Sequence, residues 1–197
     1  LNKKVVVIEK SELGGICLNW GCIPTKALLR SSEVYSLLKK SNNFGIDSKP
    51  NISIKEIVER SRKISKKLSN GIDYLFKKNK ISLIRGHAYI ENKNTILIND
   101  NNAKKIINTK NIIIATGARP KMLPFLKDSS FRVWNYVDAM IPDALPSNLG
   151  IVGSGAIGIE FASFYSDLGV KVNVYESEER ITPNEDFDIS NTLEELK

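Results

Sequence analysis

Residues 149–158 read Leu-Gly-Ile-Val-Gly-Ser-Gly-Ala-Ile-Gly and decide the fold of the second half of the chain. The apolar start of this stretch predicts a β-strand, and residues 159–168 predict a helix that is ended by Gly169. A second strand is expected over residues 170–175, closing with Glu176. The glycines have the spacing G-x-G-x-x-G, at Gly153, Gly155 and Gly158. A strand, this glycine turn, a helix and an acid about 20 residues further on are together typical of a dinucleotide-binding βαβ unit.

Each part of this unit predicts a contact with a bound dinucleotide. Gly153 permits the tight turn, Gly155 lets the backbone approach a pyrophosphate at the positive end of the helix, and Gly158 lets helix and strand pack closely. We include Ile157, inside the turn, among the cofactor contacts. The Glu176 carboxylate would accept hydrogen bonds from an adenosine ribose and repel a 2′-phosphate, which favours NAD over NADP. The alternative is a glycine turn with a purely structural purpose.

The first half of the chain has a companion acid. Residues 5–8, Val-Val-Val-Ile, predict a buried parallel strand that ends in Glu9, as the later strand ends in Glu176. Glu9 is therefore predicted to bind the ribose of a second dinucleotide, whose own glycine turn we expect before residue 1. Taken alone, Glu9 is equally well explained as an ordinary strand-end acid.

Between these two units, the apolar periodicity predicts two helices, a meander and a strand. The helices are expected over residues 22–40, with Pro24 in the first turn, and over residues 53–78. A further buried strand is expected at residues 112–115. Short strand-like pieces between Asn- and Asp-rich turns predict the meander, at residues 81–90, 95–98 and 105–107.

These elements predict an α/β fold with two domains. A connection punctuated by prolines ends near residue 146. Residues 1–145 are expected to form a doubly wound domain with a three-stranded meander. Residues 146–197 are expected to begin a Rossmann-type domain inserted after it.

The composition agrees with a globular protein and excludes several other classes. With 42% hydrophobic and 26% charged residues, the chain is unlike a disordered, collagen-like or disulfide-rich protein. No apolar run reaches the roughly 18 residues of a membrane helix. The net charge of +7 divides into +13 for residues 1–110 and −6 for residues 111–197, which supports two domains. Many basic residues fall in residues 55–80, which we interpret as a solvated helix face because the stretch lacks the interleaved aromatics of a nucleic-acid binder.

The sequence has two cysteines, Cys17 and Cys22. Such a close pair is either two inert buried thiols or a redox or metal site, and zinc is disfavoured because the single histidine, His87, is distant. Positions i and i+5 of one regular helix stand too far apart to bond, so a disulfide would require Cys17 in a loop and Cys22 at the helix start. In that position Cys22 would be stabilised as a thiolate by the helix N-terminus and by Lys26.

The segment around the cysteines resembles a known family. Residues 14–26 have the pattern G-G-x-C-x4-C-x-P, which is similar to the redox-active signature of the pyridine nucleotide-disulfide oxidoreductases, and most of all to their dihydrolipoamide dehydrogenase branch. The resemblance continues in the family's order over essentially the whole chain, at residues 86–88, 115–120, 132–134 and 153–162. Trp20 and the pair Tyr136-Val137 depart from the usual family residues.

The resemblance implies roles for the candidate residues. Cys17 would exchange thiols with the substrate, and Cys22 would face the flavin of a bound FAD as its disulfide partner. Lys26 would lie beside the flavin and pair with Glu160 near the nicotinamide, although Glu160 alone reads as a helix-surface acid. The implied FAD contacts are Glu9, Gly14, Gly15, Cys17, Lys26, Ala88, Thr116 and Gly117. The implied NAD contacts are those of the glycine turn and Glu176; no metal is expected, and His87 is expected in a loop, touching cofactor through its backbone at most.

The resemblance also implies an activity and its partners. Residues 1–145 would be an FAD-binding domain, and the reaction would be oxidation of protein-bound dihydrolipoyl groups by NAD in a 2-oxo-acid dehydrogenase complex or in glycine cleavage. The expected partners are a lipoyl domain and a second copy in a cytoplasmic homodimer, without nucleic acid or membrane. Residues 1–197 alone are expected to be inactive, because the family's acid–base histidine lies in a C-terminal interface domain. They are expected to hold FAD poorly, because the glycine turn for its pyrophosphate is expected before residue 1.

Other functions compete with this one. A glutathione or mercuric reductase would share the cysteine pair, but Glu176 disfavours both because they use NADPH. A non-catalytic remnant, or a basic binding protein that uses residues 55–80, would need neither the cysteines nor the glycine turn.

Overall fold

The computed structural model describes residues 3–100, 103–126 and 132–195. The described chain has the predicted α/β character and divides into two compact units. The first unit holds the described residues up to Gly21 together with Lys63–Arg119. The second holds Cys22–Arg62 and the described residues from Pro120 onward. This division follows packing and cuts helix α3 (Ile54–Lys78), so the domain boundary near residue 146 stays a prediction.

In the first unit, β1 (Val6–Glu9) pairs in parallel with β2 (Ser82–Arg85), and Glu9 lies opposite Arg85. The β-branched residues of β1 favour this extended strand. The expectation that the strand is buried is wrong, since Val5 and Val6 are 48% and 43% exposed. Within the described residues β2 is the one strand that pairs with β1, and Val7 and Ile8 are half-buried.

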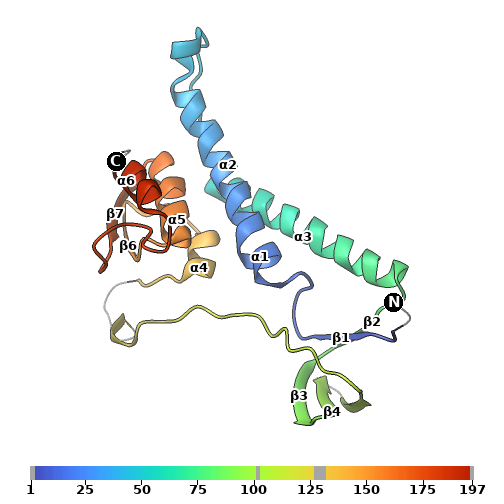
Figure 1. The fold of residues 1–197 in the computed structure, drawn as a ribbon. Coiled ribbons are helices and arrows are strands. Elements are labelled where there is room, and N and C mark those ends of the chain that lie inside the picture. The colour runs from blue at the N-terminus through green and yellow to red at the C-terminus, as the bar shows by residue number, and fades with distance from the viewer. Residues whose placement is uncertain (1–2, 101–102, 127–131, 196–197) are drawn as a thin grey trace. The chain divides into compact units, whose positions relative to one another are not determined.

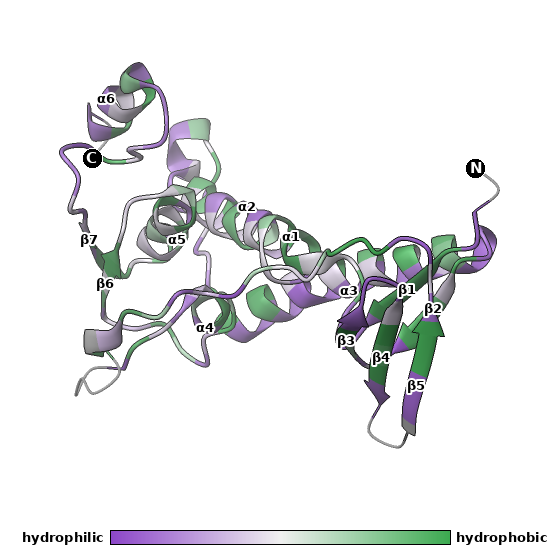
Figure 2. Ribbon diagram, turned by 60° about the horizontal axis from the view of Figure 1, so that its bottom comes forward, coloured by the Kyte–Doolittle hydropathy of each residue, from purple (hydrophilic) through white to green (hydrophobic). Residues whose placement is uncertain are grey.

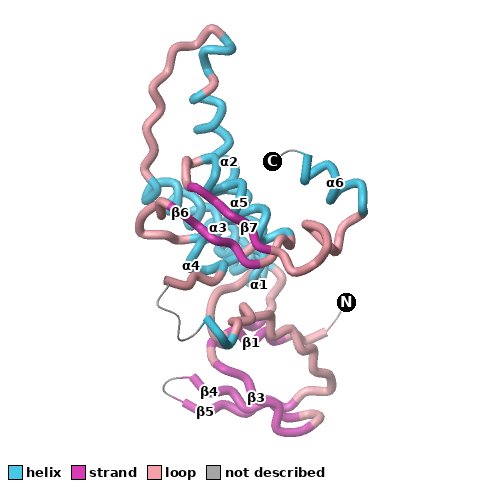
Figure 3. The backbone as a smooth tube through the Cα atoms, turned by 90° about the vertical axis from the view of Figure 1, so that its left-hand side faces the viewer, coloured by secondary structure: helices cyan, strands magenta, loops and turns pink. Residues whose placement is uncertain are grey.

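The predicted three-stranded meander is confirmed. Strands β3 (His87–Asn92), β4 (Thr95–Asp100) and β5 (Ala103–Asn108) are antiparallel in the order β3-β4-β5, and they run side by side in Figure 3. β4 is coloured largely as hydrophobic in Figure 2, and Ile98 at its centre is fully buried.

The single predicted strand over residues 81–90 is wrong, because two strands, β2 and β3, occupy it. Gly86 separates them with a φ of +147°, and a Cβ at this position would lie 2.8 Å from the carbonyl oxygen of Asn99. Only glycine fits such a turn. As a result His87 begins β3 and does not lie in a loop.

The predicted buried strand at residues 112–115 is also wrong. The segment has no regular secondary structure, and Ile113 and Ile114 are 91% and 70% exposed. A β-strand needs a hydrogen-bonding neighbour, and no strand of the described chain pairs with this segment. Apolar β-branched residues alone are therefore not enough to form the strand.

The second unit contains the predicted strand–turn–helix–strand. β6 (Asn148–Val152) leads into α5 (Ala156–Asp167), and β7 (Lys171–Tyr175) returns parallel to β6. The two strands run side by side in Figure 3. Gly169 follows the helix with a φ of +91°, as expected of a residue at the C′ position.

Aromatic residues of α5 form the core of the second unit. Phe161, Phe164 and Tyr165 are buried, and the Tyr165 hydroxyl donates to the Ala139 carbonyl at 2.6 Å. Burial raises the pKa of that hydroxyl.

Ala139 belongs to α4 (Tyr136–Met140), a short helix that the sequence analysis missed, as it also missed α6 (Phe187–Glu195). α4 is started by a capping box in which the Asn135 side chain accepts from the Val137 N–H.

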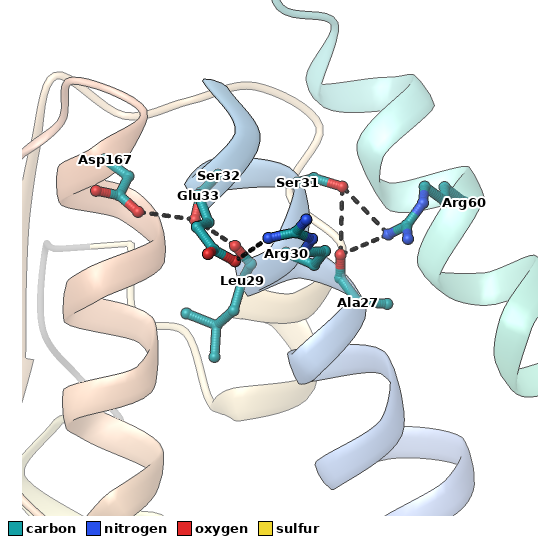
Figure 4. Close-up of polar contacts among 8 residues, drawn as sticks. All are labelled: Ala27, Leu29, Arg30, Ser31, Ser32, Glu33, Arg60 and Asp167. Carbon is teal, nitrogen blue, oxygen red and sulfur yellow. Dashed lines mark hydrogen bonds and ion pairs between the residues drawn. The ribbon is translucent and has the colours of Figure 1, made fainter. Parts of the chain in front are cut away.

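Polar contacts tie α2 (Cys22–Lys39) to its neighbours in the second unit, as Figure 4 shows. Arg60 of α3 donates to the Ala27 carbonyl at 2.7 Å and to the Ser31 hydroxyl at 3.3 Å. On another side of α2, the buried Ser32 hydroxyl donates to Asp167 of α5 at 3.0 Å. Both long helices end within about two residues of their predicted limits (Figure 1).

Candidate functional site

Cys17 and Cys22 form a disulfide and lie on two consecutive helices. Cys22 is the first residue of α2, as predicted, and Pro24 falls in the first turn. Cys17 does not lie in a loop as expected but in a separate short helix, α1 (Gly15–Trp20). The disulfide is possible because the chain breaks at Gly21, so the two cysteines are not on one continuous helix. Both cysteines are exposed.

Gly21 is a functional residue that the sequence analysis did not single out. A Cβ at Gly21 would lie 3.0 Å from both the Cys17 Cα and the Ile16 carbonyl oxygen. A side chain at Gly21 would therefore press on the backbone that carries Cys17. The position of this glycine, directly before the second cysteine, could have indicated the break between the two helices.

Buried hydrogen bonds anchor α1 within the first unit. The Asn19 side chain, which is 4% exposed, donates to the Leu13 carbonyl at 2.8 Å and to the Gly15 carbonyl at 3.0 Å. Ser69 of α3 donates to the same Leu13 carbonyl at 2.9 Å. Gly14 allows the turn into the helix with a φ of +107°. The backbone that carries Cys17 is thus held on both sides.

Lys26 and Glu160 form the ion pair that the resemblance implied. Lys26 lies one turn into α2 and Glu160 lies on α5, both in the second unit. The Lys26 side chain is 63% exposed and the Glu160 side chain 27% exposed. Such a pair adds little to stability, and it fixes the ammonium group one turn from Cys22.

The glycine turn has the geometry that its spacing predicts. Gly153 has a φ of +98°, and a Cβ on Gly158 would lie 2.1 Å from the Gly153 carbonyl oxygen. Gly155 is the N-cap residue of α5, and a Cβ there would meet no atom within 4 Å. Ile157, in the first turn of α5, is 56% exposed. The start of α5 thus packs tightly against the turn, and the space around Gly155 at the helix N-terminus stays open.

Glu176 follows β7 and accepts hydrogen bonds from the glycine turn. One carboxylate oxygen, Oε2, accepts from the Ser154 N–H at 2.7 Å and from the Ser154 hydroxyl at 2.6 Å. The other, Oε1, accepts from the backbone N–H groups of Ser177 at 2.7 Å and Glu178 at 3.1 Å. These bonds, led by the Ser154 hydroxyl, lower the pKa of Glu176 from 4.5 to about 2. The carboxylate is therefore ionised and oriented at neutral pH.

The first unit holds the other predicted cofactor contacts. Glu9 closes β1, and its Oε1 accepts from the Ser11 N–H at 2.8 Å. Gly14 and Gly15 both have positive φ, at +107° and +68°. Ala88 lies in β3 opposite Ile98. Thr116 and Gly117 follow the irregular segment 112–115, and Gly117 has a φ of +72°.

Two kinds of feature are not seen in the described ranges. No three His, Cys, Asp or Glu side chains gather there in a group that could hold a metal ion. No helix of these ranges combines the length and apolar character needed to cross a membrane.

Comparison with known proteins identifies close relatives of this arrangement. A family model described as pyridine nucleotide-disulphide oxidoreductase matches residues 1–197. A dihydrolipoyl dehydrogenase of Zymomonas mobilis is 44% identical over 192 residues, which cover 96% of this chain and 41% of that protein. A dihydrolipoyl dehydrogenase of Bacillus subtilis is 39% identical over 206 residues, covering 100% of this chain and 44% of the relative.

Solved structures agree in fold. LpdA from Mycobacterium tuberculosis superposes with a TM-score of 0.88 at 27% identity, covering 99% of this chain and 43% of that one. The HOCl-induced flavoprotein disulfide reductase RclA from Escherichia coli, in a Cu(II) complex, has a TM-score of 0.82 at 27% identity, covering 98% and 41%. The chain thus spans about two fifths of the length of the proteins it matches. The predicted fold class and family resemblance are confirmed.

Proposed function

The chain belongs to the pyridine nucleotide-disulphide oxidoreductase family, and from this premise we propose that the protein oxidises dihydrolipoyl groups with NAD. The observation that supports this most is the exposed Cys17–Cys22 disulfide at the start of α2. The relatives named dihydrolipoyl dehydrogenase support the substrate class. In this proposal Cys17 and Cys22 are the residues that receive the substrate's electrons.

The thiol exchange uses the two cysteines in different roles. A thiolate of the dihydrolipoyl group attacks Cys17 Sγ, breaks the Cys17–Cys22 bond and leaves Cys22 as a thiolate. The second substrate thiol then attacks the substrate sulfur of the mixed disulfide, which yields the oxidised lipoyl ring and releases Cys17. One substrate proton stays on Cys17 and the other passes to solvent, and the two electrons remain on the cysteine pair. The N-terminus of α2 and the Lys26 ammonium group stabilise the Cys22 thiolate.

FAD is the cofactor we assign to the first unit. When bound, it passes the two electrons from the cysteine pair to NAD. The residues present fit it: the Ser11 N–H holds the Glu9 carboxylate at the end of β1, where a ribose diol can donate to it. Gly15 is the first residue of α1, and a Cβ there would meet no atom within 4 Å, so its backbone is open to a ligand. Gly14, directly before it, allows the turn with a φ of +107°. The proposed contacts of Ala88, Thr116 and Gly117 rest on the family resemblance.

NAD is the cofactor we assign to the second unit. The open space at Gly155, in front of α5, fits a pyrophosphate that accepts from the helix N-terminus. The oriented carboxylate of Glu176 fits the adenosine ribose, and its charge repels the 2′-phosphate of NADP. Glu160, paired with Lys26, is proposed to lie beside the nicotinamide.

The partners follow from the same premise. We assign the lipoyl domain of a 2-oxo-acid dehydrogenase complex, or of glycine cleavage, as the substrate carrier. We further assign a homodimer that works in the cytoplasm. These assignments rest on the bacterial relatives named dihydrolipoyl dehydrogenase.

A second candidate is a reductase of another disulfide or oxidant, and the similarity to RclA favours it. Steady-state rates of the full-length protein separate the two. We expect turnover with dihydrolipoamide and NAD, and a fall to the background rate in Cys17→Ser and in Cys22→Ser. Faster oxidation of NADPH by glutathione disulfide or by a mercuric salt than of dihydrolipoamide by NAD would replace the proposed function with a reductase.

A further inference from the structure

We propose that Ser154 is a positioning residue that sets the choice of nucleotide by holding the Glu176 carboxylate through its buried hydroxyl. The inference rests on the proposed NAD site and deepens it. Ser154 is the second residue of the glycine turn, at a position where the G-x-G-x-x-G spacing specifies no residue type. Its side chain is fully buried, and its backbone N–H and its hydroxyl both donate to the same oxygen, Oε2.

The five hydrogen bonds to Glu176 differ in kind. Three come from backbone N–H groups, those of Ser154, Ser177 and Glu178, and these donors are present whatever the side chains are. The other two come from side-chain hydroxyls, that of Ser154 to Oε2 at 2.6 Å, the shortest of the five, and that of Ser177 to Oε1 at 3.4 Å, the longest. Ser154 thus contributes the one side-chain hydrogen bond to Oε2 among the described residues. All five bonds go to an ionised acceptor and are therefore strong, and loss of the Ser154 hydroxyl would remove one of the two donors to Oε2.

A second layer of buried groups keeps the Ser154 hydroxyl in place. The Thr182 N–H lies 3.2 Å from both the hydroxyl oxygen and the carbonyl oxygen of Ser154. Thr182 has a φ of +45°, which a threonine adopts only when its surroundings impose it. Its own hydroxyl lies 3.2 Å from that of Ser190, which in turn accepts from Arg180 at 2.8 Å. Residues of the loop after β7 and of α6 therefore hold the Ser154 side chain of the glycine turn in place.

This arrangement has a consequence for the ribose. A diol can donate to both carboxylate oxygens only if the carboxylate keeps one orientation. Without the Ser154 hydroxyl, Oε2 keeps a single donor and the carboxylate can rotate. A rotating carboxylate binds the ribose diol of NAD less well and repels the 2′-phosphate of NADP less strongly. Both the affinity for NAD and the discrimination against NADP therefore fall.

The test compares Ser154→Ala with Ser32→Ala in the full-length protein. Ser32 is the matched control, because it is also fully buried and also donates to a carboxylate, that of Asp167, at 3.0 Å (Figure 4). We expect Ser154→Ala to raise KM for NAD about threefold to tenfold, because four of the five hydrogen bonds remain, with kcat unchanged at saturating NAD. The ratio of KM for NADP to KM for NAD should fall. Ser32→Ala should change neither KM nor the ratio.

A Ser154→Ala variant with unchanged KM and unchanged ratio would overturn the inference. The Glu176→Ala variant distinguishes a wrong role for Ser154 from a wrong assignment of the NAD site. If Glu176→Ala raises KM for NAD while Ser154→Ala does not, the NAD site stands and Ser154 has no part in it. If Glu176→Ala also leaves KM unchanged, the proposed NAD site fails and the inference with it. If Ser154→Ala does not fold, Ser154→Cys replaces it, because cysteine has nearly the same volume and a thiol that donates only weakly. Its KM for NAD should lie between the wild-type value and the value expected for Ser154→Ala.

Discussion

The two strand-end glutamates, Glu9 and Glu176, occupy corresponding places and are held very differently. Glu176 accepts five hydrogen bonds through its two carboxylate oxygens, two of them from the glycine turn. Within the described residues, Glu9 accepts one, from the Ser11 N–H. Both follow a parallel strand, so the strand alone does not position the acid. The turn packed beside the strand end does, and the βαβ unit around Glu176 contains such a turn.

The largest effect expected from this comparison concerns the glycines of the two units. Gly158→Ala places a Cβ 2.1 Å from the Gly153 backbone carbonyl, which cannot move without opening the turn. We expect a loss of about 3 kcal/mol in the free energy of unfolding, together with loss of NAD binding. Gly14→Ala presses instead on the ends of the Leu18 and Ile72 side chains, at 2.7 and 3.0 Å, at a φ of +107°. It should cost about 1 to 2 kcal/mol and leave NAD binding intact.

Urea denaturation and NAD titration of both variants measure this difference. If Gly158→Ala is as stable as the wild type, the tight contact between turn and helix is not what shapes the second unit.

An intermediate effect concerns acid stability. The pKa of Glu176 in the folded protein is about 2, below its ordinary value of 4.5, so its ionised form stabilises the fold. This contribution is complete above about pH 4.5 and is lost as the pH falls toward 2. Glu176→Gln should therefore be less stable than the wild type at pH 7, and the two should converge in acid. Urea midpoints measured from pH 7 down to pH 3 give the result. Glu9→Gln is the control, and its urea midpoint should fall with pH as much as that of the wild type. If the urea midpoint of Glu176→Gln lies below that of the wild type by the same amount at every pH, the account is contradicted.

These comparisons also show which parts of the molecule a sequence reveals. The unit from β6 to β7 was predicted closely, because a strand, a glycine turn and a helix are defined by residues near one another in the chain. The segment 112–115 has an equally clear apolar pattern and forms no strand, because pairing depends on distant residues. The break at Gly86 was missed because a single glycine does not interrupt the apolar pattern of residues 81–90, which therefore predicts one continuous strand.

The site was predictable to a similar degree. The glycine and cysteine motifs led to Cys17, Cys22, Gly158 and Glu176, and the implied pair of Lys26 with Glu160 is present. The helical setting of Cys17 was missed because six residues between two glycines are too few to show a helical period. The contacts of Ser154 were missed because its partners are 22 and 28 positions away. Buried serines have no distinctive sequence pattern.

The smallest expected effect concerns a glycine with free space around it. Gly71 lies inside α3, and a Cβ there would meet no atom within 4 Å. Gly71→Ala should raise the free energy of unfolding by about 0.5 to 1 kcal/mol, since alanine loses less backbone freedom in a helix. Thermal or urea unfolding tests this, and a destabilised variant would show that the space around Gly71 is filled in solution. The same substitution thus stabilises or destabilises according to what the new Cβ meets.

The most direct test of the central claim follows the redox state of the cysteine pair. Both cysteines lie in one tryptic peptide, Ser11–Lys26, because no lysine or arginine separates them. The full-length protein is incubated with dihydrolipoamide, quenched with an alkylating reagent, digested and weighed by mass spectrometry, with and without NAD added before the quench. If the Cys17–Cys22 disulfide carries electrons from dihydrolipoyl groups to NAD, this peptide gains both labels with dihydrolipoamide and loses them when NAD is added. A peptide that stays unlabelled with dihydrolipoamide, or that stays labelled after NAD, would contradict the account.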